Sequence, residues 1–361
     1  MRSPSDPPRR DSVPPIELVV ESALEAAPAP ELVLEAVPPP LAQTPPPLGD
    51  LDERPPLENR FSWSKSRHDM FSGCQRRYFL HYYAYWGGWD EEADERRRRL
   101  YVLRRLSSKE QWAGIAVHEA IARALYRQRR GRPIPLPELI ADTRARMRGE
   151  WRSSSRRDYW HVRRGFGLLE HEYADEVPAE AWRANWDLVE RCLLGLEGSP
   201  TWARILASDR GRWKPIDQLD SFDVDGVEVW AAPDFAFEEA GGRLEIVDWK
   251  TGQPRPSDVL QLAAYAAFAE ARWGVSPDAI TGTIAYLAAG TETKVPLDRA
   301  AIAGFVTEAR ASIAGMRAIL AAPEHNHPHP EERYPRTAER WRCAGCSFRG
   351  ECWDGGKVPA E

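Results

Sequence analysis

The sequence of 361 residues has no apolar run long enough to cross a bilayer, which takes about 20 residues. It also has no Gly-x-x-x-x-Gly-Lys-Ser/Thr phosphate loop. The first absence argues against a membrane-spanning helix, and we expect no membrane contact. The second means that any ATP-driven unwinding must come from a partner.

Cysteine is scarce. The chain has five cysteines, an odd number, and no recognisable signal peptide. Extracellular scaffolds held by disulfides use many paired cysteines, whereas cytosolic proteins keep their thiols reduced. We therefore expect a cytoplasmic protein whose cysteines serve another purpose.

Residues 1–58 lack aromatic residues and cysteine but hold 15 of the 31 prolines. Such a composition cannot build a core, so it predicts a disordered Pro/Ala-rich tail, a candidate attachment point for a partner such as a helicase. Residues 59–355 are long enough for one globular α/β domain. The apolar patterns predict strands at about 219–237, 243–250 and 279–288, helices over about 110–210 that form an insertion beside the sheet, and a helix over Arg299–Leu320.

Acidic residues are sparse in one segment of this otherwise mildly acidic chain, whose formal net charge is −6. Residues 96–164 contain 20 Lys/Arg against 6 Asp/Glu, a local excess of +14, so the rest carries −20. Such an excess suits a phosphate backbone, and the interleaved aromatics suit unpaired bases; they are Tyr101, Tyr126, Trp151, Tyr159 and Trp160. The alternative is a solvated helical insertion with Arg/Glu pairs.

Two apolar runs joined by Glu-Glu-Ala-Gly-Gly predict a hairpin of buried strands, Val227–Phe237 and Leu244–Trp249. Asp234 lies on the first, and Asp248 is followed two positions later by Lys250. Because side chains alternate along a strand, Asp248 and Lys250 share a face, and pairing can bring Asp234 alongside. Carboxylates suit Mg²⁺ or Mn²⁺, and a lysine can help to activate a water for attack on a phosphodiester.

An ordinary hairpin with solvent-facing charges is the alternative. However, Asp248 stands within an Ile-Val-Asp-Trp run, where a buried carboxylate is costly unless a cation compensates it. Nearby helices supply more polar groups. Gln261 and Tyr265 share one face of a helix predicted over Pro256–Trp273. His118 lies on the apolar face of a helix predicted over 114–125; a lone histidine there is commonly a core residue, but the carboxylate pair favours a ligand.

These residues together resemble the PD-(D/E)XK nuclease superfamily, specifically its RecB-like branch. Pro233-Asp234 and Asp248-x-Lys250 match the pattern that names the superfamily. The resemblance implies a restriction-endonuclease-like core, a central mixed sheet flanked by helices. It implies that His118, Asp234, Asp248 and the Trp249 carbonyl hold Mg²⁺ or Mn²⁺, that Lys250 is catalytic, and that Gln261 and Tyr265 position the site and the nucleic-acid backbone.

The cysteines have a distinctive spacing. Cys343, Cys346 and Cys352 form a C-x₂-C-x₅-C triplet, and Cys74 lies 269 positions before it on a helix predicted within 61–80, with a Ser66/Asp69 capping box. Four thiolates can hold zinc or an iron–sulfur cluster. One distant cysteine plus a C-terminal triplet resembles the AddB nuclease domain and CRISPR-associated RecB-like exonucleases, which implies a structural [4Fe–4S] cluster. A structural zinc site is the alternative, and Cys192 is predicted to be an ordinary buried residue.

We therefore expect a DNA exonuclease acting on single-stranded or frayed ends, in repair, recombination or phage defence including the CRISPR context. Two alternatives stay open, namely an idle DNA-binding scaffold of the same fold and a nuclease acting on RNA. The intact set of His118, Asp234, Asp248 and Lys250 favours an enzyme, because an idle descendant has no chemical reason to keep all of them.

Overall fold

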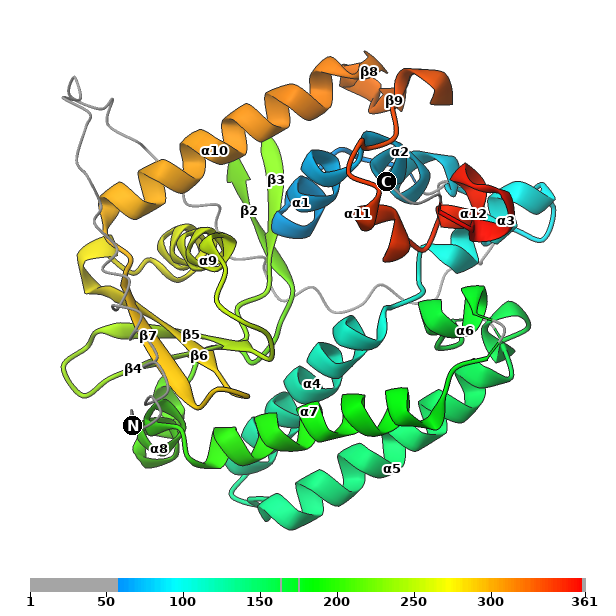
Figure 1. Cartoon of the computed structure of the whole chain (residues 1–361). Helices are drawn as coiled ribbons and strands as arrows, with labels where there is room; N and C mark the ends of the chain where they lie inside the picture. Colours follow the sequence, from blue (N-terminus) through cyan, green and yellow to red (C-terminus); the bar gives the residue numbers. More distant parts are fainter. Residues whose placement is uncertain (1–57, 163, 175, 359–361) are drawn as a thin grey trace, which may run out of the picture. The chain divides into compact units, whose positions relative to one another are not determined.

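The computed structural model describes residues 58–162, 164–174 and 176–358, so the predicted tail of residues 1–58 lies, apart from its last residue, outside the described residues. The described part is a mixed α/β structure in which helices flank the sheets, and this confirms the predicted fold class (Figure 1). None of its helices has the length and apolar character needed to cross a membrane.

The central sheet has four strands in the order β4–β5–β6–β7. β5 and β6 run parallel, whereas β4 and β7 pair antiparallel at the edges. β5 is almost wholly buried, as expected of a strand with helices on both sides. The strand bounds are β4 Phe235–Glu238, β5 Leu244–Lys250, β6 Ile280–Tyr286 and β7 Thr291–Pro296.

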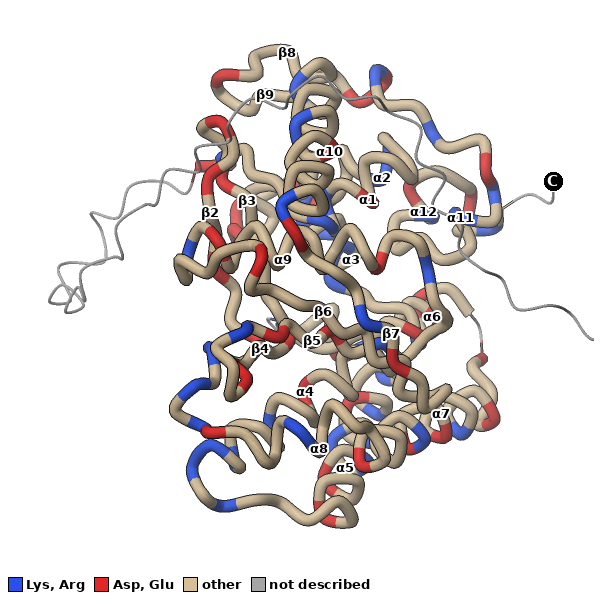
Figure 2. Tube along the Cα trace, turned by 90° about the vertical axis from the view of Figure 1, so that its left-hand side faces the viewer, with Lys and Arg blue, Asp and Glu red and all other residues tan. Residues whose placement is uncertain are grey.

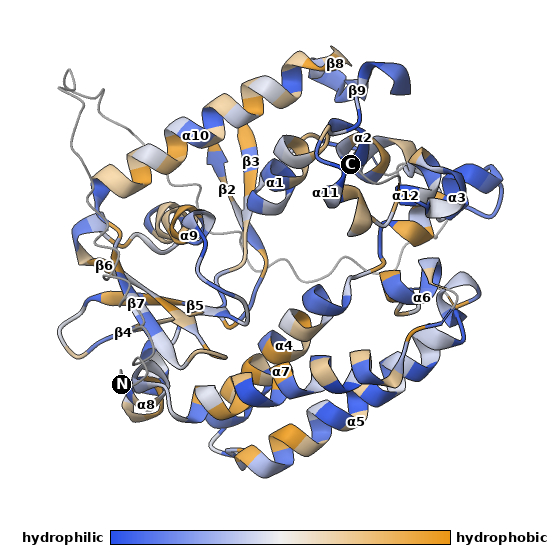
Figure 3. Cartoon of the chain, in the orientation of Figure 1, coloured by the Kyte–Doolittle hydropathy of each residue, from blue (hydrophilic) through white to orange (hydrophobic). Residues whose placement is uncertain are grey.

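Helices cover both faces of this sheet (Figure 1). On one face, Val247 and Trp249 of β5 join a core cluster with α4 (Lys109–Arg129) and α7 (Ala179–Glu197). On the other face lies α9 (Pro256–Trp273), which begins with proline at its first position and ends at Gly274 in the left-handed conformation, φ 66°. Hydrophobic residues recur along α4 and α9, while α3 is mostly hydrophilic (Figure 3).

The other helices frame this core. Those within the predicted insertion, besides α4 and α7, are α5 (Leu136–Ser155), α6 (Leu169–Tyr173) and α8 (Pro200–Ala207). The rest are α1 (Lys65–Gly73), α2 (Gln75–Phe79), a π-helical turn (Leu80–Ala84), α3 (Glu95–Leu103), α10 (Arg299–Ala318), α11 (Trp341–Ala344) and α12 (Arg349–Cys352). The predictions over 256–273 and 299–320 are confirmed as α9 and, to within two residues, α10.

The predicted hairpin is wrong in its first strand. The run 227–237 is broken at Ala232-Pro233-Asp234. Its first part, β3 (Val227–Ala231), joins a second sheet in the order β1–β3–β2, with β1 Trp63–Ser64 and β2 Asp220–Val224, while only β4 pairs with β5. Proline cannot donate to a ladder, so the chain changes sheets there, and Asp234 lies in the break rather than on a strand.

The predicted first helix is also interrupted. Its N-cap is Ser64, whose hydroxyl accepts from Arg67 N, rather than Ser66. The chain is extended at Cys74 (φ −167°), which ends α1 and caps α2. Met70 and Tyr78 are therefore not on one helical stripe with Cys74, because the helix restarts at this residue.

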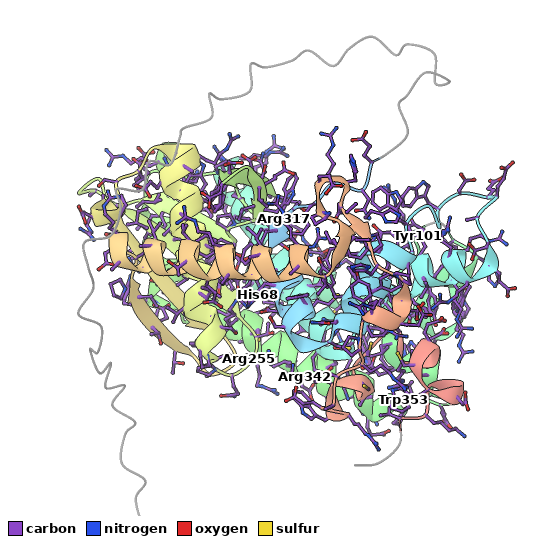
Figure 4. All side chains as sticks on the ribbon, turned by 90° about the horizontal axis from the view of Figure 1, so that it is seen from above. His68, Tyr101, Arg255, Arg317, Arg342 and Trp353 are labelled. Carbon is purple, nitrogen blue, oxygen red and sulfur yellow. The ribbon has the colours of Figure 1, made fainter. Side chains whose placement is uncertain are left out.

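α10 is fastened to the β1–β3–β2 sheet and to α1. Ser312 on α10 accepts a hydrogen bond from Trp63 Nε1 at 3.0 Å and lies 2.8 Å from His68 Nδ1, and His68 is seen beside α10 in Figure 4. α10 leads into a small two-stranded sheet of β8 (Leu320–Ala322) and β9 (His327–Pro328), and from there to the cysteine triplet.

A buried ion cluster ties α8 to the sheet. Glu245 on β5 accepts hydrogen bonds from Thr283 and Lys294, each at 2.6 Å, and from Arg204 of α8. Burial alone would raise the pKa of Glu245, but these donors outweigh it and lower the pKa to about 2.

This lowered pKa predicts an acid-labile contribution to stability. The carboxylate stabilises the fold above the unfolded-state pKa of about 4.3, and the contribution is lost as the pH falls towards 2. At pH 7 we expect Glu245→Gln to lower the free energy of unfolding by about 2–3 kcal/mol, because it leaves the partly exposed cations of Arg204 and Lys294 without their buried carboxylate partner. Urea unfolding across pH 2–7 would measure this difference, which should shrink towards low pH. A difference that is constant with pH would contradict the ion pairing.

Candidate active site

A cavity of about 940 Å³ opens over the ends of β3 and β5, between α1, α4 and α9. Most of the polar residues predicted from the sequence converge on it. His118, Trp249, Lys250, Gln261 and Tyr265 line the cavity. The two predicted aspartates lie behind this lining and contact it.

Asp234 links helix α4 to strand β5. Its Oδ1 lies 3.1 Å from Nδ1 of His118, and its Oδ2 accepts the backbone N–H of Trp249 at 2.8 Å. The predicted proximity of Asp234 to β5 is therefore present, although the aspartate precedes β4 instead of lying on a strand. His118 is not an ordinary core residue, because its side chain is 30% exposed and its ring is hydrogen-bonded to the Asp234 carboxylate.

Asp248 and Lys250 begin a polar chain towards α9. Lys250 Nζ lies 2.6 Å from Asp248 Oδ2 and donates to Gln261 Oε1 at 2.7 Å, and Gln261 Nε2 donates to Tyr265 OH at 2.6 Å. The alternation of β5 aims Asp248 and Lys250 away from Val247 and Trp249, so this chain faces α9. The expected i, i+4 pairing of Gln261 with Tyr265 is confirmed.

Burial governs the charges here. Asp248 is fully buried, and although Lys250 is close, neither carboxylate oxygen accepts a hydrogen bond of good geometry. Burial, together with the charge of Asp234, raises the pKa of Asp248 to about 7. Burial alone would lower the pKa of His118, but Asp234 outweighs it and raises the pKa to about 9. Burial also raises the pKa of Tyr265.

The carboxylate oxygens are the donor type that hard divalent cations such as Mg²⁺ and Mn²⁺ prefer, and the imidazole nitrogen is a softer donor beside them. Within the site, His118 pairs with Asp234, and Lys250 lies 2.6 Å from one oxygen of Asp248 without an aligned hydrogen bond. Between residues 58 and 358, leaving aside 163 and 175, no three His, Cys, Asp or Glu side chains form a ready metal site. The oxygens of Asp248, buried without a hydrogen bond, are the clearest sign of a cation's place.

Two further residues of the cavity were not predicted. Asp258 is buried and accepts from Arg255 N at 2.9 Å and from Tyr286 OH at 3.1 Å, which fixes the start of α9 and so the placement of Gln261. Arg255 is exposed at the cavity. The run Arg-Pro-Ser-Asp, with proline and an acidic residue in a first helical turn, is the sequence signal for Asp258.

The comparison with known families agrees with this geometry. A family model described as the PD-(D/E)XK nuclease superfamily matches residues 62–353. The chain belongs to this superfamily. Its members are nucleases, which typically use Mg²⁺ or Mn²⁺ to hydrolyse phosphodiester bonds in nucleic acids. A search of curated proteins found no significant match.

Four cysteines of this PD-(D/E)XK protein surround a second, small cavity. Cys74, Cys343, Cys346 and Cys352 line a space of about 20 Å³, which adjoins one of about 180 Å³ lined by three of them. All are free thiols. Residues 269 positions apart in the sequence therefore meet, although over the described ranges the thiols are not arranged as a formed metal centre. Cys192 is fully buried in the core of α7, as predicted.

The charge around the thiols is positive. Burial raises the pKa of Cys346, with Cys74 and Cys343 adding to the rise and Arg77 opposing it. Burial likewise raises the pKa of Cys352 to about 11, and Arg76 and Arg336 oppose this. Cys74 Sγ accepts the backbone N–H of Arg77 at 3.5 Å as the cap of α2. These arginines favour an anionic form of the site.

The acid-poor segment folds differently from the expected basic face. Arg96 pairs with Glu331 and Glu351, and Arg99 also pairs with Glu351, so acids far along the chain neutralise them. Two of the interleaved aromatics serve the interior: Tyr159 is buried, and Trp151 packs on Trp112 with ring centroids 6.1 Å apart. Base stacking by these two rings is therefore not possible where they lie.

The raised pKa of Asp248 leads to a prediction about stability in EDTA. Because the folded-state pKa lies above the unfolded value of about 3.9, the free energy of unfolding should fall as the pH rises from about 4 to 7. Asp248→Asn removes this charge. We expect the variant to be about 2 kcal/mol more stable than the wild type at pH 8, and the difference to vanish below pH 4. Urea unfolding in EDTA measures the free energy of unfolding of the wild type and of the variant at each pH. A variant that is less stable than the wild type at pH 8 would show that Lys250 fully compensates the carboxylate.

Proposed function

We propose that this chain is a metal-dependent DNA nuclease in which His118, Asp234, Asp248 and the main-chain carbonyl of Trp249 hold Mg²⁺ or Mn²⁺. The carboxylate of Asp248 carries the proposal: it is fully buried behind the cavity lining, with Lys250 2.6 Å from one oxygen and no aligned hydrogen bond on either oxygen. A buried carboxylate lowers the stability of the fold unless a cation compensates its charge. Lys250 compensates the charge of Asp248 only in part.

When bound, the ion supplies Lewis-acid polarisation of a phosphate oxygen and makes water more acidic. The protein's part is positioning. Asp234 orients the His118 ring through Nδ1 and is itself held by the Trp249 N–H. Gln261, supported by Tyr265, holds the Lys250 ammonium at the cavity wall, where it can orient the attacking water and offset charge that develops on the phosphate.

An enzyme explains the site better than an idle scaffold of the same fold. A binding module gains nothing from a buried carboxylate that destabilises it, and a hydrophobic residue at position 248 would pack better. DNA is the proposed substrate because the motifs resemble those of RecB-like DNA nucleases, with exonuclease action on single-stranded or frayed ends. RNA is the alternative that the same assay tests.

The main prediction from this site concerns catalysis. Lys250→Ala and Asp248→Ala should each lower the cleavage rate by about 10²–10⁴-fold, because each removes a group needed at the reacting phosphate. End-labelled single-stranded DNA, duplex DNA and RNA incubated with Mn²⁺ would measure the rates. Mn²⁺ should raise the thermal midpoint of the wild type but not of Asp248→Ala.

Leu194→Ala serves as the control, because Leu194 is 52% exposed on α7 and does not line the cavity. Wild-type cleavage in either active-site variant would overturn the assignment. Faster cleavage of RNA than of both DNA forms would show that RNA is the substrate, and the assignment of the active-site residues would be unchanged.

We further propose that Cys74, Cys343, Cys346 and Cys352 bind a structural [4Fe–4S] cluster, with zinc as the alternative. Their shared cavity, their free thiols and the surrounding arginines support an anionic metal–thiolate centre. Such a centre would join α2 to the last helices and close a loop of 269 positions, whose entropy is on the order of 5 kcal/mol.

The proposed cluster predicts a definite composition and a contribution to stability. Anaerobically purified protein should be brown, with about four iron atoms and four sulfides per chain. Cys346→Ser should lose iron and several kcal/mol of stability, whereas Cys192→Ser should keep its iron and lose only about 1–2 kcal/mol. Colourless protein with one zinc per chain would replace the cluster with zinc, and metal-free protein of full stability would exclude both.

A further inference from the structure

Arginines gather where the end of α4 meets the turn after α8. Arg129 is the last residue of α4, and Arg130 and Arg132 follow it in the loop. The turn Arg210–Arg212 lies against this loop, since Arg210 Nη1 is 3.8 Å from the position that a Cβ on Gly131 would take. We call Arg129, Arg130, Arg132, Arg210 and Arg212 the basic patch. Figure 2 shows Lys and Arg residues concentrated in the loops beside α8.

The patch differs from the arginines that the sequence pointed to first. All five of its arginines are exposed. In the ranges that the structure covers, Arg129, Arg130, Arg132 and Arg210 make no ion pair, while Arg212 lies 3.8 Å from Asp209 and donates to the backbone carbonyl of Glu239 at 3.4 Å. Arg96, Arg99 and Arg156 by contrast are each paired with a carboxylate. Unpaired exposed guanidinium groups are free to bind phosphates.

The patch and the candidate metal site are connected by α4 and lie on the same face of this helix. On α4, Arg129 follows His118 by eleven residues, which at 100° per residue returns it to within about 20° of the same face. The rise along the helix is about 16 Å. In B-DNA, where successive phosphates of a strand are about 3.4 Å apart along the axis, this distance corresponds to about five base pairs.

A rigid segment holds the turn of the patch relative to Asp234. After Arg212, Lys214 N donates to Ala236 O at 2.9 Å and Asp217 N donates to Asp234 O at 3.2 Å. Tyr126 OH of α4 donates to Ile216 O at 2.8 Å. The two loops of the patch are thus fastened to the elements that carry His118 and Asp234, so the spacing between patch and site is built into the fold.

From this we infer that the basic patch binds the phosphate backbone of duplex DNA about five base pairs from the bond that is cut. The inference rests on the proposed nuclease function. The duplex is the proposed ligand because the spacing between the patch and the site matches a run of about five base pairs. Tyr126, whose ring is 46% exposed on this end of α4, is the candidate for stacking on an unpaired base, and the single-stranded arm of the test covers that outcome.

The test compares three double variants of the full chain, each with two fewer positive charges than the wild type. Arg129→Gln/Arg130→Gln and Arg210→Gln/Arg212→Gln alter the patch. Arg183→Gln/Arg310→Gln is the control, because these arginines are exposed but paired with Glu180 and Asp225. Binding of a fluorescent 30-base-pair duplex is measured in EDTA over a range of salt concentrations, with thermal midpoints to verify folding.

Each patch variant should reduce the slope of log K against log salt by about 1.8, or about 0.9 for each phosphate that an arginine no longer neutralises, while the control keeps the wild-type slope. A duplex too short to reach the patch should bind the wild type and the three double variants with equal affinity. An unchanged slope in both patch variants, or an equal reduction in the control, would overturn the inference. So would a reduction seen with single-stranded DNA alone.

The outcome is independent of catalysis. If the slope falls in the patch variants but the wild type cleaves nothing with Mn²⁺, the basic patch is a DNA-binding surface and the proposed nuclease function is wrong. If the wild type cleaves DNA and the slopes of the patch variants do not change, the nuclease function is supported and the proposed role of the basic patch is wrong.

Discussion

The burial of a carboxylate in the middle of β5 is the constraint around which this structure is organised. Asp248 lies in a strand covered on both faces, where an isolated negative charge is strongly disfavoured. Lys250 approaches it from two positions along the strand, Gln261 holds that lysine, and Asp258 fixes the helix that carries Gln261. Much of the polar structure around the cavity can be understood as support for this one group.

The alternation of β5 divides its residues between two tasks. Val247 and Trp249 pack with α4 and α7 in the core, while Asp248 and Lys250 face α9 and the polar chain. Glu245, on the core side, is also charged, but Arg204, Lys294 and Thr283 satisfy it fully, and its pKa is low. Two buried carboxylates three residues apart therefore differ in kind: one is a stable structural anion, and the other has a raised pKa at the edge of a cavity.

The distribution of arginine shows how tertiary structure changes the meaning of local charge. The segment 96–164 has a large excess of positive residues, yet two of its arginines, Arg96 and Arg99, meet Glu331 or Glu351 from the far end of the chain. Those acids also lie close to the cysteine triplet, so the pairs help to hold both ends of the domain together. Arg129, Arg130 and Arg132 at the end of α4, and Arg210 in the turn that lies against them, form no ion pair within the described residues.

Local patterns in the sequence were sufficient for the superfamily, the class of fold and five of the residues that line the cavity. Spacing within one element placed Asp248 with Lys250 and Gln261 with Tyr265, because strand and helix periodicities put such pairs on one face. Local rules failed where the chain changes partners: the break at Pro233 sends β3 to another sheet, and the turn at Cys74 divides the first helix. The resemblance implied that His118 meets Asp234 and that the four distant cysteines share one site; the folded chain brings each set together, and it alone decided which arginines are left unpaired. These features join residues far apart in sequence, and they depend on packing that no local pattern encodes.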